Sequence, residues 1–306
     1  MGFIVPFSLQ SIQLARDEHF SRLDTFGCSI QAVEKILRYG APVGAVIKQY
    51  SQLERCMDQL ECMMREAEDK GEVLAAGTVV LADVLTGSCG RFARSWHAPP
   101  GGLWLAMAWP DTLLPEFSRL LPFAVGLACC RTIRSYRVDA YLKWVNDVLV
   151  CDRKVAGILC RTVLSPGGER YHLLGVGINV NNQLFPEELV DDAVGLAAVC
   201  GYAVSLEECI GRLLAELNWT LGVLCYDEAL ALHHRESCEQ GRCSLLLRGW
   251  EQYSNSPGRR VLYGFDVQKK PLYQAVVKGI DSCGGLIMEL KDGGLITEYS
   301  GEIRYI

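Results

Sequence analysis

Amine, amide and carboxylate side chains recur in two short segments near the middle of the chain. Residues 143–147 read Lys-Trp-Val-Asn-Asp, and residues 153–157 read Arg-Lys-Val-Ala-Gly. A β-hairpin over residues 142–160 would bring four of these side chains to one end of a sheet, namely Lys143, Asn146, Asp147 and Lys154. A carboxylate and an amide beside two amines suit a magnesium–nucleotide, whose phosphates the amines neutralise. Asn-Asp is also a common turn dipeptide, so a plain turn is the alternative.

Two glycine-containing segments flank this hairpin in the sequence. Residues 87–102 carry Arg91 and Arg94 on an expected loop, where backbone N–H and guanidinium groups can surround carboxylate or phosphate oxygens. A surface loop with solvated charges is the alternative. Residues 175–179 read Gly-Val-Gly-Ile-Asn, in which glycines let a ligand lie close to the backbone and Asn179 offers a donor and an acceptor. Taken alone, this glycine pattern is a weak signal.

The composition excludes several classes of protein. The chain has 306 residues, which is enough for about two domains. Half of the residues are hydrophobic and the net charge is -6, which argues against a disordered chain and against a general nucleic-acid binder. The longest apolar run, residues 120–130, is too short to span a membrane. The first residues lack the basic segment of a secretion signal, so we expect a cytoplasmic protein without a membrane partner.

The 14 cysteines are scattered and form no Cys-x-x-Cys pair. In a large chain without a secretion signal, this pattern predicts reduced thiols that serve as small core residues. The alternative is a metal site in the segment that holds Cys225, His233, His234, Cys238 and Cys243. His234 and Cys238 would share a helix face, but the spacing fits no usual zinc pattern. The structural interpretation is therefore favoured.

The elements that must position these side chains follow from hydrophobic periodicity and turn residues. Helical spacing predicts helices over residues 29–39, 53–68, 113–134 and 206–233. Apolar runs predict strands over residues 44–50, 73–85, 103–109 and 171–180, in addition to the hairpin. After Gly249, short β-type runs alternate with turn signals at roughly ten-residue spacing, which suggests a small barrel. We therefore expect a large mixed α/β domain followed by a compact β domain.

In this order and spacing, the segments resemble the biotin–protein ligase family, within the wider biotin/lipoate ligase superfamily. That family shows Arg-x-Trp-x-Ser-Pro-x-Gly, then Lys-Trp-Pro-Asn-Asp, then Arg-Lys-Val-Ala-Gly-Ile, then Gly-Ile-Asn. The matching stretches here are residues 94–101, 143–147, 153–158 and 177–179. Near the end, Trp250-Glu, Gly279-Ile-Asp, Asp292-Gly-Gly and Gly301-Glu-Ile look like the SH3-like domain of the family. The resemblance covers roughly residues 45–306.

The resemblance implies a fold and a domain organisation. Residues 46–246 would form a mixed sheet flanked by helices, an α/β (α+β) catalytic domain of the class II synthetase-like kind. Residues 247–306 would form the SH3-like β barrel. Residues 1–45 are not basic and are too few for the winged helix that binds DNA in bifunctional members, so we expect no DNA binding. The sheet edge commonly mediates homodimers in this family, so a homodimer is one possible state.

The resemblance also implies a reaction with ATP and Mg²⁺ as co-substrates and no tightly bound cofactor. Biotin would be activated to biotinoyl-AMP and then transferred to a lysine of an acceptor carrier protein. By family correspondence Lys154 touches both the carboxylate and the phosphate. Asp147 and Asn146 serve the Mg–ATP side, with Asp147 as the metal contact, and Asn179 serves the nucleotide. Arg91 and Arg94 lie on a loop that closes over the adenylate and keeps water out.

The departures from the family pattern concentrate where biotin would be recognised. The usual Ser-Thr-Asn aligns with residues 55–58, or else with residues 51–53. Thr86 replaces the Gln before the loop, and Cys89 replaces an Arg within it. We assign the substrate side to Arg55, Cys56, Met57, Thr86, Cys89, Gly90, Trp96, Lys143 and Gly157. A buried polar group without a partner costs about 1–3 kcal/mol, so such changes can alter selectivity. Three hypotheses stay open: a divergent biotin ligase, a ligase for lipoate or a fatty acid, and a non-catalytic relative that binds a ligand or carrier.

Overall fold

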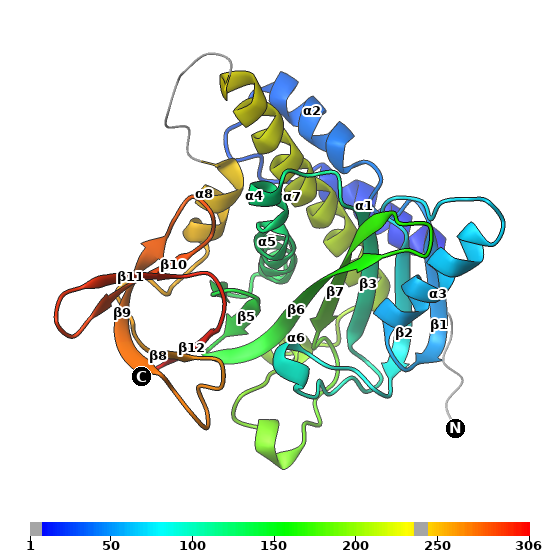
Figure 1. Ribbon diagram of the computed structural model, residues 1–306. Coiled ribbons are helices and arrows are strands. Elements are labelled where there is room, and N and C mark those ends of the chain that lie inside the picture. The colour runs from blue at the N-terminus through cyan, green and yellow to red at the C-terminus, as the bar shows by residue number, and fades with distance from the viewer. Residues whose placement is uncertain (1–7, 236–243) are drawn as a thin grey trace.

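A computed structural model describes residues 8–235 and 244–306 of the chain. Its larger part is built on a seven-stranded mixed sheet with the strand order β1-β2-β3-β7-β6-β5-β4 (Figure 1). The strands are β1 (Ile47–Leu53), β2 (Val79–Leu85), β3 (Leu103–Pro110), β4 (Ala140–Lys143), β5 (Asp147–Val150), β6 (Arg153–Leu164) and β7 (Arg170–Ile178). Only β1 and β2 pair in parallel, and the crossover between them is the helix α3 (Cys56–Glu68).

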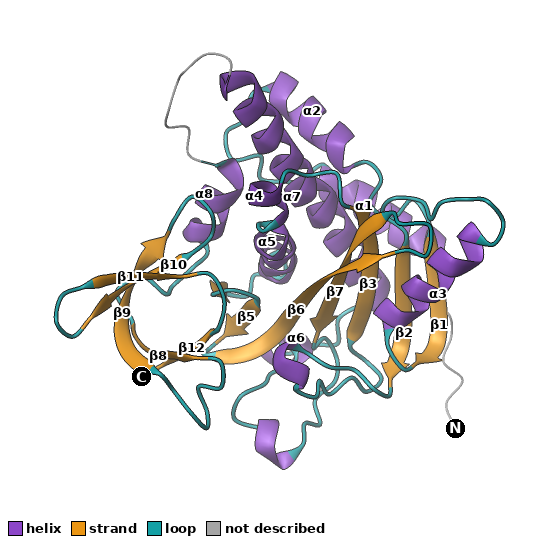
Figure 2. Ribbon diagram, viewed as in Figure 1, coloured by secondary structure: helices purple, strands orange, loops and turns teal. Residues whose placement is uncertain are grey.

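Helices cover the two faces of this sheet unequally (Figure 2). The larger layer includes α1 (Leu9–Phe20), α2 (Ile30–Gly40), α5 (Leu121–Arg134) and α7 (Leu206–Arg235). On β3, Leu105 and Met107 face this layer, whereas Ala106 and Ala108 face α3 on the other side. Both faces of the strand are buried, so β3 reads in the sequence as an unbroken apolar run. The short helices are α4 (Pro115–Ser118), α6 (Leu196–Cys200) and α8 (Leu245–Gln252), with 3-10 turns at Arg91–Ala93 and Glu187–Leu189.

The first two helices pack on α7 at unusually short range. A Cβ added to Gly222 of α7 would lie 2.1 Å from the backbone oxygen of Ile36 in α2. A Cβ added to Gly211 would lie 2.6 Å from the backbone oxygen of Ile12 in α1. These distances are below any real Cβ contact, so glycine at both positions is what lets the helix backbones approach. The segment before β1 is thus a helical layer on α7.

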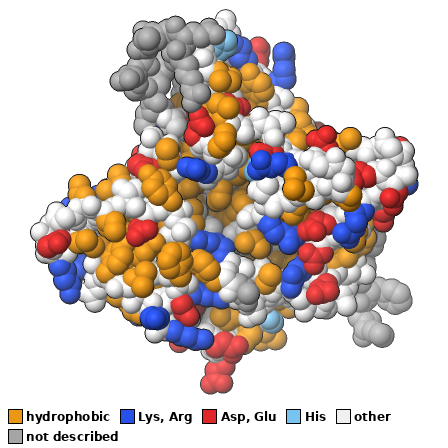
Figure 3. Space-filling view, in the orientation of Figure 1, with side chains coloured by type: hydrophobic (Ala, Val, Ile, Leu, Met, Phe, Trp, Pro, Cys, Tyr) orange, Lys and Arg blue, Asp and Glu red, His pale blue; other side chains and the backbone are white. Residues whose placement is uncertain are grey.

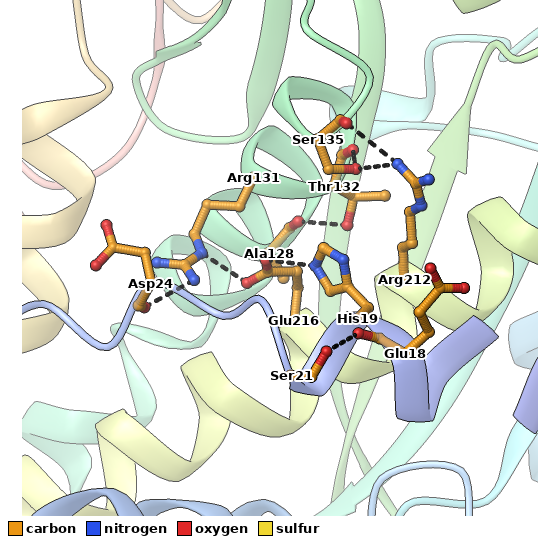
Figure 4. A network of polar contacts seen from close by, with 10 residues as sticks. All are labelled: Glu18, His19, Ser21, Asp24, Ala128, Arg131, Thr132, Ser135, Arg212 and Glu216. Carbon is orange, nitrogen blue, oxygen red and sulfur yellow. Dashed lines mark hydrogen bonds and ion pairs between the residues drawn. The ribbon is translucent and has the colours of Figure 1, made fainter. Parts of the chain in front are cut away.

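A buried polar network joins α1, α5 and α7 (Figure 4). One carboxylate oxygen of Glu216 on α7 accepts from His19 Nε2 at 2.8 Å, and the other accepts from Arg131 Nε at 2.6 Å. Arg131 also donates to the backbone oxygen of Asp24 at 2.9 Å. His19, Arg131 and Glu216 are each less than a tenth exposed. The shared carboxylate thus pairs two of the donors that this helix packing buries, whereas Arg131 Nη1 has no hydrogen-bond partner among the described residues.

The C-terminal part is a separate five-stranded antiparallel sheet with the order β11-β10-β9-β8-β12. Its strands are β8 (Arg260–Gly264), β9 (Tyr273–Ile280), β10 (Leu286–Leu290), β11 (Leu295–Glu298) and β12 (Glu302–Tyr305). Gly258 and Gly293 adopt positive φ in its turns, as the turn signals of the sequence predict. The indole of Trp144 donates to the backbone oxygen of Gly284 at 3.1 Å and ties this sheet to the larger part. The predicted combination of a mixed α/β part and a small β part is confirmed.

Three predicted elements differ from the structure for local reasons. The helix expected over residues 113–134 is divided into α4 and α5, because Pro115 and Pro122 each stand in a first helical turn. The strand expected from Val73 begins only at Val79, because Gly77 turns the chain with a φ of +73°. The first arm of the hairpin is two strands, β4 and β5, separated by the turn at residues 144–146. No helix within the described residues is long and apolar enough to cross a membrane.

Candidate active site

A row of residues in register crosses the face of the large sheet on which α3 packs. Lys143 pairs with Asp147, Asp147 with Gly157, Gly157 with Gly177, and Gly177 with Trp104. Residues directly opposite each other on neighbouring strands point to the same face. The row therefore places a lysine and a carboxylate at one end, a bare glycine surface in the middle and an indole at the other end. We call Gly157, Gly175 and Gly177 the glycine floor.

Lys154 joins this row through a β-bulge. It pairs with Leu149, the register between β5 and β6 shifts at Val148/Leu149, and Val155 and Ala156 are both buried in the core of the helical layer. The extra residue on β6 lets Lys154 share the face of Gly157, three positions along, which regular alternation would forbid. As a result the Lys154 Nζ lies 2.6 Å from Asp147 Oδ1.

Asp147 stands between two lysines. The Lys143 Nζ lies 3.9 Å from Asp147 Oδ2, whereas the Lys154 Nζ contacts the other oxygen, Oδ1. Burial by itself raises the pKa of Asp147, but the two lysines outweigh it and hold this pKa below the usual value. Burial lowers the pKa of Lys143, and the attraction of Asp147 opposes that shift. The cluster is thus an ionised carboxylate that orients two cations.

Residues 87–96, which we call the substrate loop, form a small hairpin above the floor. Cys89 and Ser95 make a bridge, and the Gly90 N–H donates to the Arg94 oxygen at 2.8 Å. A Cβ on Gly177 would lie 2.8 Å from Trp96 Nε1, so the indole rests directly on the floor. The indole N–H has no hydrogen-bond partner in the described part of the chain. Lys154 Nζ is 5.0 Å from the centre of the indole ring.

The two arginines of the substrate loop point to different partners. Arg91 donates to Asn146 Oδ1 at 3.1 Å, and Asn146 donates in turn to the Ile158 oxygen at 2.9 Å. Through Asn146, Arg91 lies on the side of the loop that faces the lysine cluster. The guanidinium of Arg94 instead binds Glu302 and Asp266 of the C-terminal part. In this structure Arg94 does not face the lysine cluster, because two carboxylates hold it at the tip of the loop.

Residues 55–57 lie at the start of α3, beside the glycine floor. Arg55 Nε donates to the Gly87 oxygen at 2.7 Å and so supports the base of the substrate loop. The thiol of Cys56 contacts the Trp104 oxygen at 3.7 Å, and burial raises its pKa to about 12, so the thiol is neutral. The Met57 methyl group would be 2.5 Å from a Cβ on Gly175 and covers that end of the floor.

Two further predicted substrate residues have mainly local contacts. Thr86 is exposed, and its backbone N–H donates to the Leu53 oxygen at 3.0 Å, which aligns the start of the loop with β1. Its hydroxyl group contacts the same oxygen at 3.5 Å and is therefore directed toward β1. Cys89 is half-buried within the loop hairpin. Thr86 thus lies directly before the substrate loop and Cys89 within it, and the Thr86 hydroxyl is directed to β1 rather than to the floor.

Asn179 lies at the end of β7 with a partner that the sequence reasoning missed. Its Oδ1 accepts from Asn182 Nδ2 at 2.9 Å, and its backbone N–H donates to the Val155 oxygen at 2.8 Å. Lys154 N–H donates to the Asp192 oxygen at 2.7 Å, so the segment after Asn182 returns to the bulge. Asn182 is buried, and the repeated asparagines of Asn179-Val-Asn-Asn182 were the available signal.

A cavity of about 350 Å³ opens beside Arg91 and Asn146, next to the lysine cluster. Its walls include Arg91, Asn146, Arg119, Phe123 and Cys160. In Figure 3 lysine and arginine side chains gather over the middle of the drawn face, between the two sheets. Such a basic hollow suits an anionic ligand.

The structure offers no resident metal centre within residues 8–235 and 244–306. No three His, Cys, Asp or Glu side chains in these ranges converge in a way that could hold an ion. Of the alternative cysteine–histidine cluster, Cys238 and Cys243 lie outside the described residues. Asp147 is the carboxylate in contact with both lysines, so a Mg²⁺ held by it would take its other ligands from phosphate and water.

Comparisons with known proteins point to one family of ligases. The sequence model of the Biotin/lipoate A/B protein ligase family matches residues 59–181, which contain the substrate loop, the lysine cluster and the glycine floor. This match covers 123 of the 306 residues of the chain. It is 29% identical over 236 residues to the bifunctional ligase/repressor BirA of Bacillus subtilis, covering 74% of the chain and 66% of that protein. Identity to the BirA of Escherichia coli is 27% over 232 residues, covering 75% and 67%.

Solved structures of the ligase family share the fold. The biotin protein ligase of Aquifex aeolicus, in complex with biotin and ATP, aligns with a TM-score of 0.65 at 21% identity. The alignment covers 86% of this chain and 99% of that one. The chain spans just under two thirds of the length of the Bacillus BirA proteins, so the match does not extend over their whole length.

Proposed function

We propose that this family member activates biotin with ATP and transfers it to a lysine of a carrier protein. The observation that carries the proposal is the Lys154–Asp147 pair, 2.6 Å apart, beside a glycine floor covered by Trp96. Once the indole lifts from the floor, a flat acid can lie between it and the bare backbone with its carboxylate at Lys154. The solved relative in complex with biotin and ATP and the curated ligases support this choice of substrates.

In the first step an oxygen of the biotin carboxylate forms a bond to the α-phosphorus of ATP. The bond from that phosphorus to the bridging oxygen breaks, and pyrophosphate leaves. Two anions must approach, so cations placed where they meet stabilise the transition state. Lys154 and Lys143 fill this role beside Asp147, and Arg91 adds a third cation through Asn146.

Magnesium would accompany ATP in this step. Asp147 Oδ2 is 3.9 Å from Lys143 and is the less tightly held carboxylate oxygen, so it is the group that would contact the ion. Mg²⁺ commonly takes one or two carboxylates and fills its shell with phosphate oxygens and water. Asn179, with its partner Asn182, would hold the nucleotide at the end of β7.

In the second step the amine of the acceptor lysine attacks the carbonyl carbon of the adenylate. The bond from carbon to the phosphate oxygen breaks, AMP leaves, and the amine loses a proton to solvent. Water must be kept from the activated carbonyl until then. The substrate loop supplies the cover, because Trp96 lies directly on the floor.

One observation favours a second candidate, a ligase for lipoate or a fatty acid. At the start of α3, Arg55 Nε is already bonded to Gly87 and the Cys56 thiol to Trp104. These are the positions that align with the family's biotin-recognising Ser-Thr-Asn. Biotin carries a ureido ring that needs such partners, whereas an apolar chain does not. Met57, a flexible side chain, would pack against such a chain.

We also propose a domain organisation, a cellular compartment and an assembly for this chain. Residues 1–45 would be an extension fastened to the catalytic domain at 46–246, followed by the SH3-like domain at 247–306. The packing of α1 and α2 on α7 supports the first part. The acidic balance supports an absence of DNA binding. The unpaired cysteines fit the reducing cytoplasm, and a homodimer through a sheet edge is the possible assembly.

Calorimetric titration tests the substrate. The protein would be titrated with biotin, lipoate and octanoate, each with a non-hydrolysable ATP analogue present, and pyrophosphate release would be followed with ATP. Selective biotin binding with release of pyrophosphate supports the proposal. Binding of lipoate or octanoate alone selects the second candidate. Binding of an acid without turnover, or of none of the three, overturns the ligase function and leaves a non-catalytic relative.

A further inference from the structure

The tip of the substrate loop is fastened to the C-terminal sheet by a bidentate ion pair. Arg94 Nη1 donates to Glu302 Oε2 at 2.6 Å, and Arg94 Nη2 donates to Glu302 Oε1 at 2.5 Å. Arg94 Nη2 also lies 3.4 Å from Asp266 Oδ1. Paired N–H···O bonds between a guanidinium and a carboxylate are among the strong hydrogen bonds of proteins. Arg94 and Glu302 are 208 residues apart in the chain, so this contact spans the two sheets.

Glu302 is held in place independently of the loop. Its backbone belongs to β12 and pairs with Gly264 of β8. Its Oε1 also accepts from the backbone N–H of Val267 at 2.8 Å, and its side chain is only 18% exposed. A carboxylate fixed in this way gives Arg94 a ready partner and limits the side-chain entropy lost on pairing.

A second contact, between aromatic rings, reinforces the ion pair. Phe92 meets Phe265 edge to face with ring centroids 6.1 Å apart. Phe92 has a φ of +56°, an unfavourable conformation for a residue other than glycine that needs support from its surroundings. Phe265 and Asp266 are neighbours in the segment after β8, so the same short stretch of the C-terminal part makes both the aromatic and the second ionic contact.

The two ends of the substrate loop are bound to the large sheet and to the residue before α3. Trp96 rests on Gly157 and Gly177, and Arg55 holds the Gly87 oxygen. The loop therefore bridges the floor and the C-terminal sheet. An acid that enters beneath Trp96 requires the indole to lift, and the tip contacts oppose that movement. The strength of those contacts then sets how long the loop stays closed over an activated acid.

We infer that Glu302 is a positioning residue, which holds the substrate loop closed over the reaction intermediate by pairing with Arg94. The consequence for catalysis rests on the proposed ligase function, but the effect on the loop does not. Glu302 touches no reacting atom in this scheme. Asp266 and Phe265 assist it from the same sheet.

Hydrogen exchange followed by mass spectrometry tests the effect on the loop in the full chain without ligands. Glu302→Gln keeps the shape of the side chain and an acceptor for Val267, but removes the charge. We expect amides 87–96 to exchange about tenfold faster, since charge-assisted bonds are roughly twice as strong as neutral ones. The matched control is Glu289→Gln on β10, which removes a surface carboxylate paired with Lys278 on the same sheet. It should leave loop exchange unchanged.

Two further variants, Asp266→Asn and Phe265→Ala, allow the same test if Glu302→Gln does not fold. Each removes one tip contact and should accelerate loop exchange by a smaller factor, while exchange in α5 and α7 stays as in the native protein. If amides 87–96 exchange at the native rate in Glu302→Gln, the inference is overturned. If Glu302→Gln does not fold, native exchange rates in both Asp266→Asn and Phe265→Ala overturn it.

The catalytic consequence is measured as the ratio of adenylate released into solution to acyl group transferred to the acceptor protein. If native protein forms an adenylate, Glu302→Gln should form it within a few-fold of the native rate and release several times more of it, whereas Glu289→Gln should not. A native protein that forms no adenylate refutes the proposed function and leaves the exchange result to decide the role of Glu302. Adenylate that is formed and equally retained by both variants refutes the positioning role in catalysis.

Discussion

Lys154 and Asp147 form the closer of the two lysine–carboxylate contacts, although the strands do not pair them with each other. The sheet pairs Lys154 with Leu149 and Asp147 with Gly157, and the bulge at Val155 turns the lysine back toward the carboxylate. The amines of Lys143 and Lys154 therefore lie together beside the glycine floor. The local irregularity of β6 is therefore part of the site, as β-bulges beside active sites commonly are.

Replacing Lys154 by alanine should lower pyrophosphate release about 10²–10³-fold, because a cation aimed at the reacting oxygens is lost. Release of radiolabelled pyrophosphate measures the effect directly. Arg153→Ala is the matched control, since Arg153 is the exposed neighbour on the same strand. It should retain activity within a few-fold. A Lys154 variant as active as the control would contradict the assignment.

Gly177→Ala should weaken binding of the acid about tenfold or more, because the new methyl group would lie 2.8 Å from Trp96 and push the indole off the floor. Titration calorimetry gives the affinity, and indole fluorescence reports the displacement. A double-mutant cycle with Trp96→Ala provides the control. The two changes should be strongly non-additive, since they act on one contact. Additive losses would mean that Trp96 does not lie on Gly177 in solution.

Part of this arrangement was predictable because its signals are local. The spacing of Lys143, Asp147 and Lys154 indicates a polar hairpin. Pro115 and Pro122 are local signals too, and they mark the starts of α4 and α5 that the single helix expected over residues 113–134 overlooked. The bulge was not predictable from the hairpin itself. Val155 and Ala156 are both apolar, so strict alternation would place Lys154 on the face opposite Gly157. Only the packing of both residues against the helical layer decides the face of Lys154.

The role of Arg94 was harder to predict for a different reason. Its position in the loop suggests a phosphate contact, and nothing near it in the sequence indicates an acidic partner. Glu302 and Asp266 come from the C-terminal sheet, and only tertiary folding brings them to the loop. Arg55, Cys56 and Met57 were assigned to the substrate side by alignment alone, and the structure adds that Arg55 and Cys56 already contact backbone oxygens.

Activity should fall on the alkaline side below the ordinary pKa of lysine. Burial lowers the pKa of Lys143, so its charge is lost as pH rises through that lowered value, and the attraction for phosphate is lost with it. The pH profile of kcat/KM for ATP measures this limb. Lys143→Arg stays charged throughout and should extend the plateau to higher pH. Identical alkaline limbs in the two proteins would exclude Lys143 as the titrating group.

At the acid end Asp147 should stay ionised to unusually low pH. Burial opposes this, but Lys154 and Lys143 hold its pKa below the unfolded value. Its contribution to stability is therefore complete above the unfolded pKa and is lost as pH falls through the lower folded pKa. Urea unfolding across the acid range should show a smaller loss of stability in Asp147→Asn than in the native protein. An equal loss in both would show that other carboxylates dominate.

Glu216→Gln should lower the free energy of unfolding by about 3 kcal/mol, because Arg131 is left as a buried charge without its carboxylate. Urea unfolding followed by circular dichroism measures the loss. Glu208→Gln is the matched control on α7, since Glu208 is 44% exposed and pairs with Arg212 one turn away. An exposed pair of this kind contributes at most about 1 kcal/mol. Equal losses would mean that the network joining α1, α5 and α7 stabilises the helical layer no more than a surface pair does.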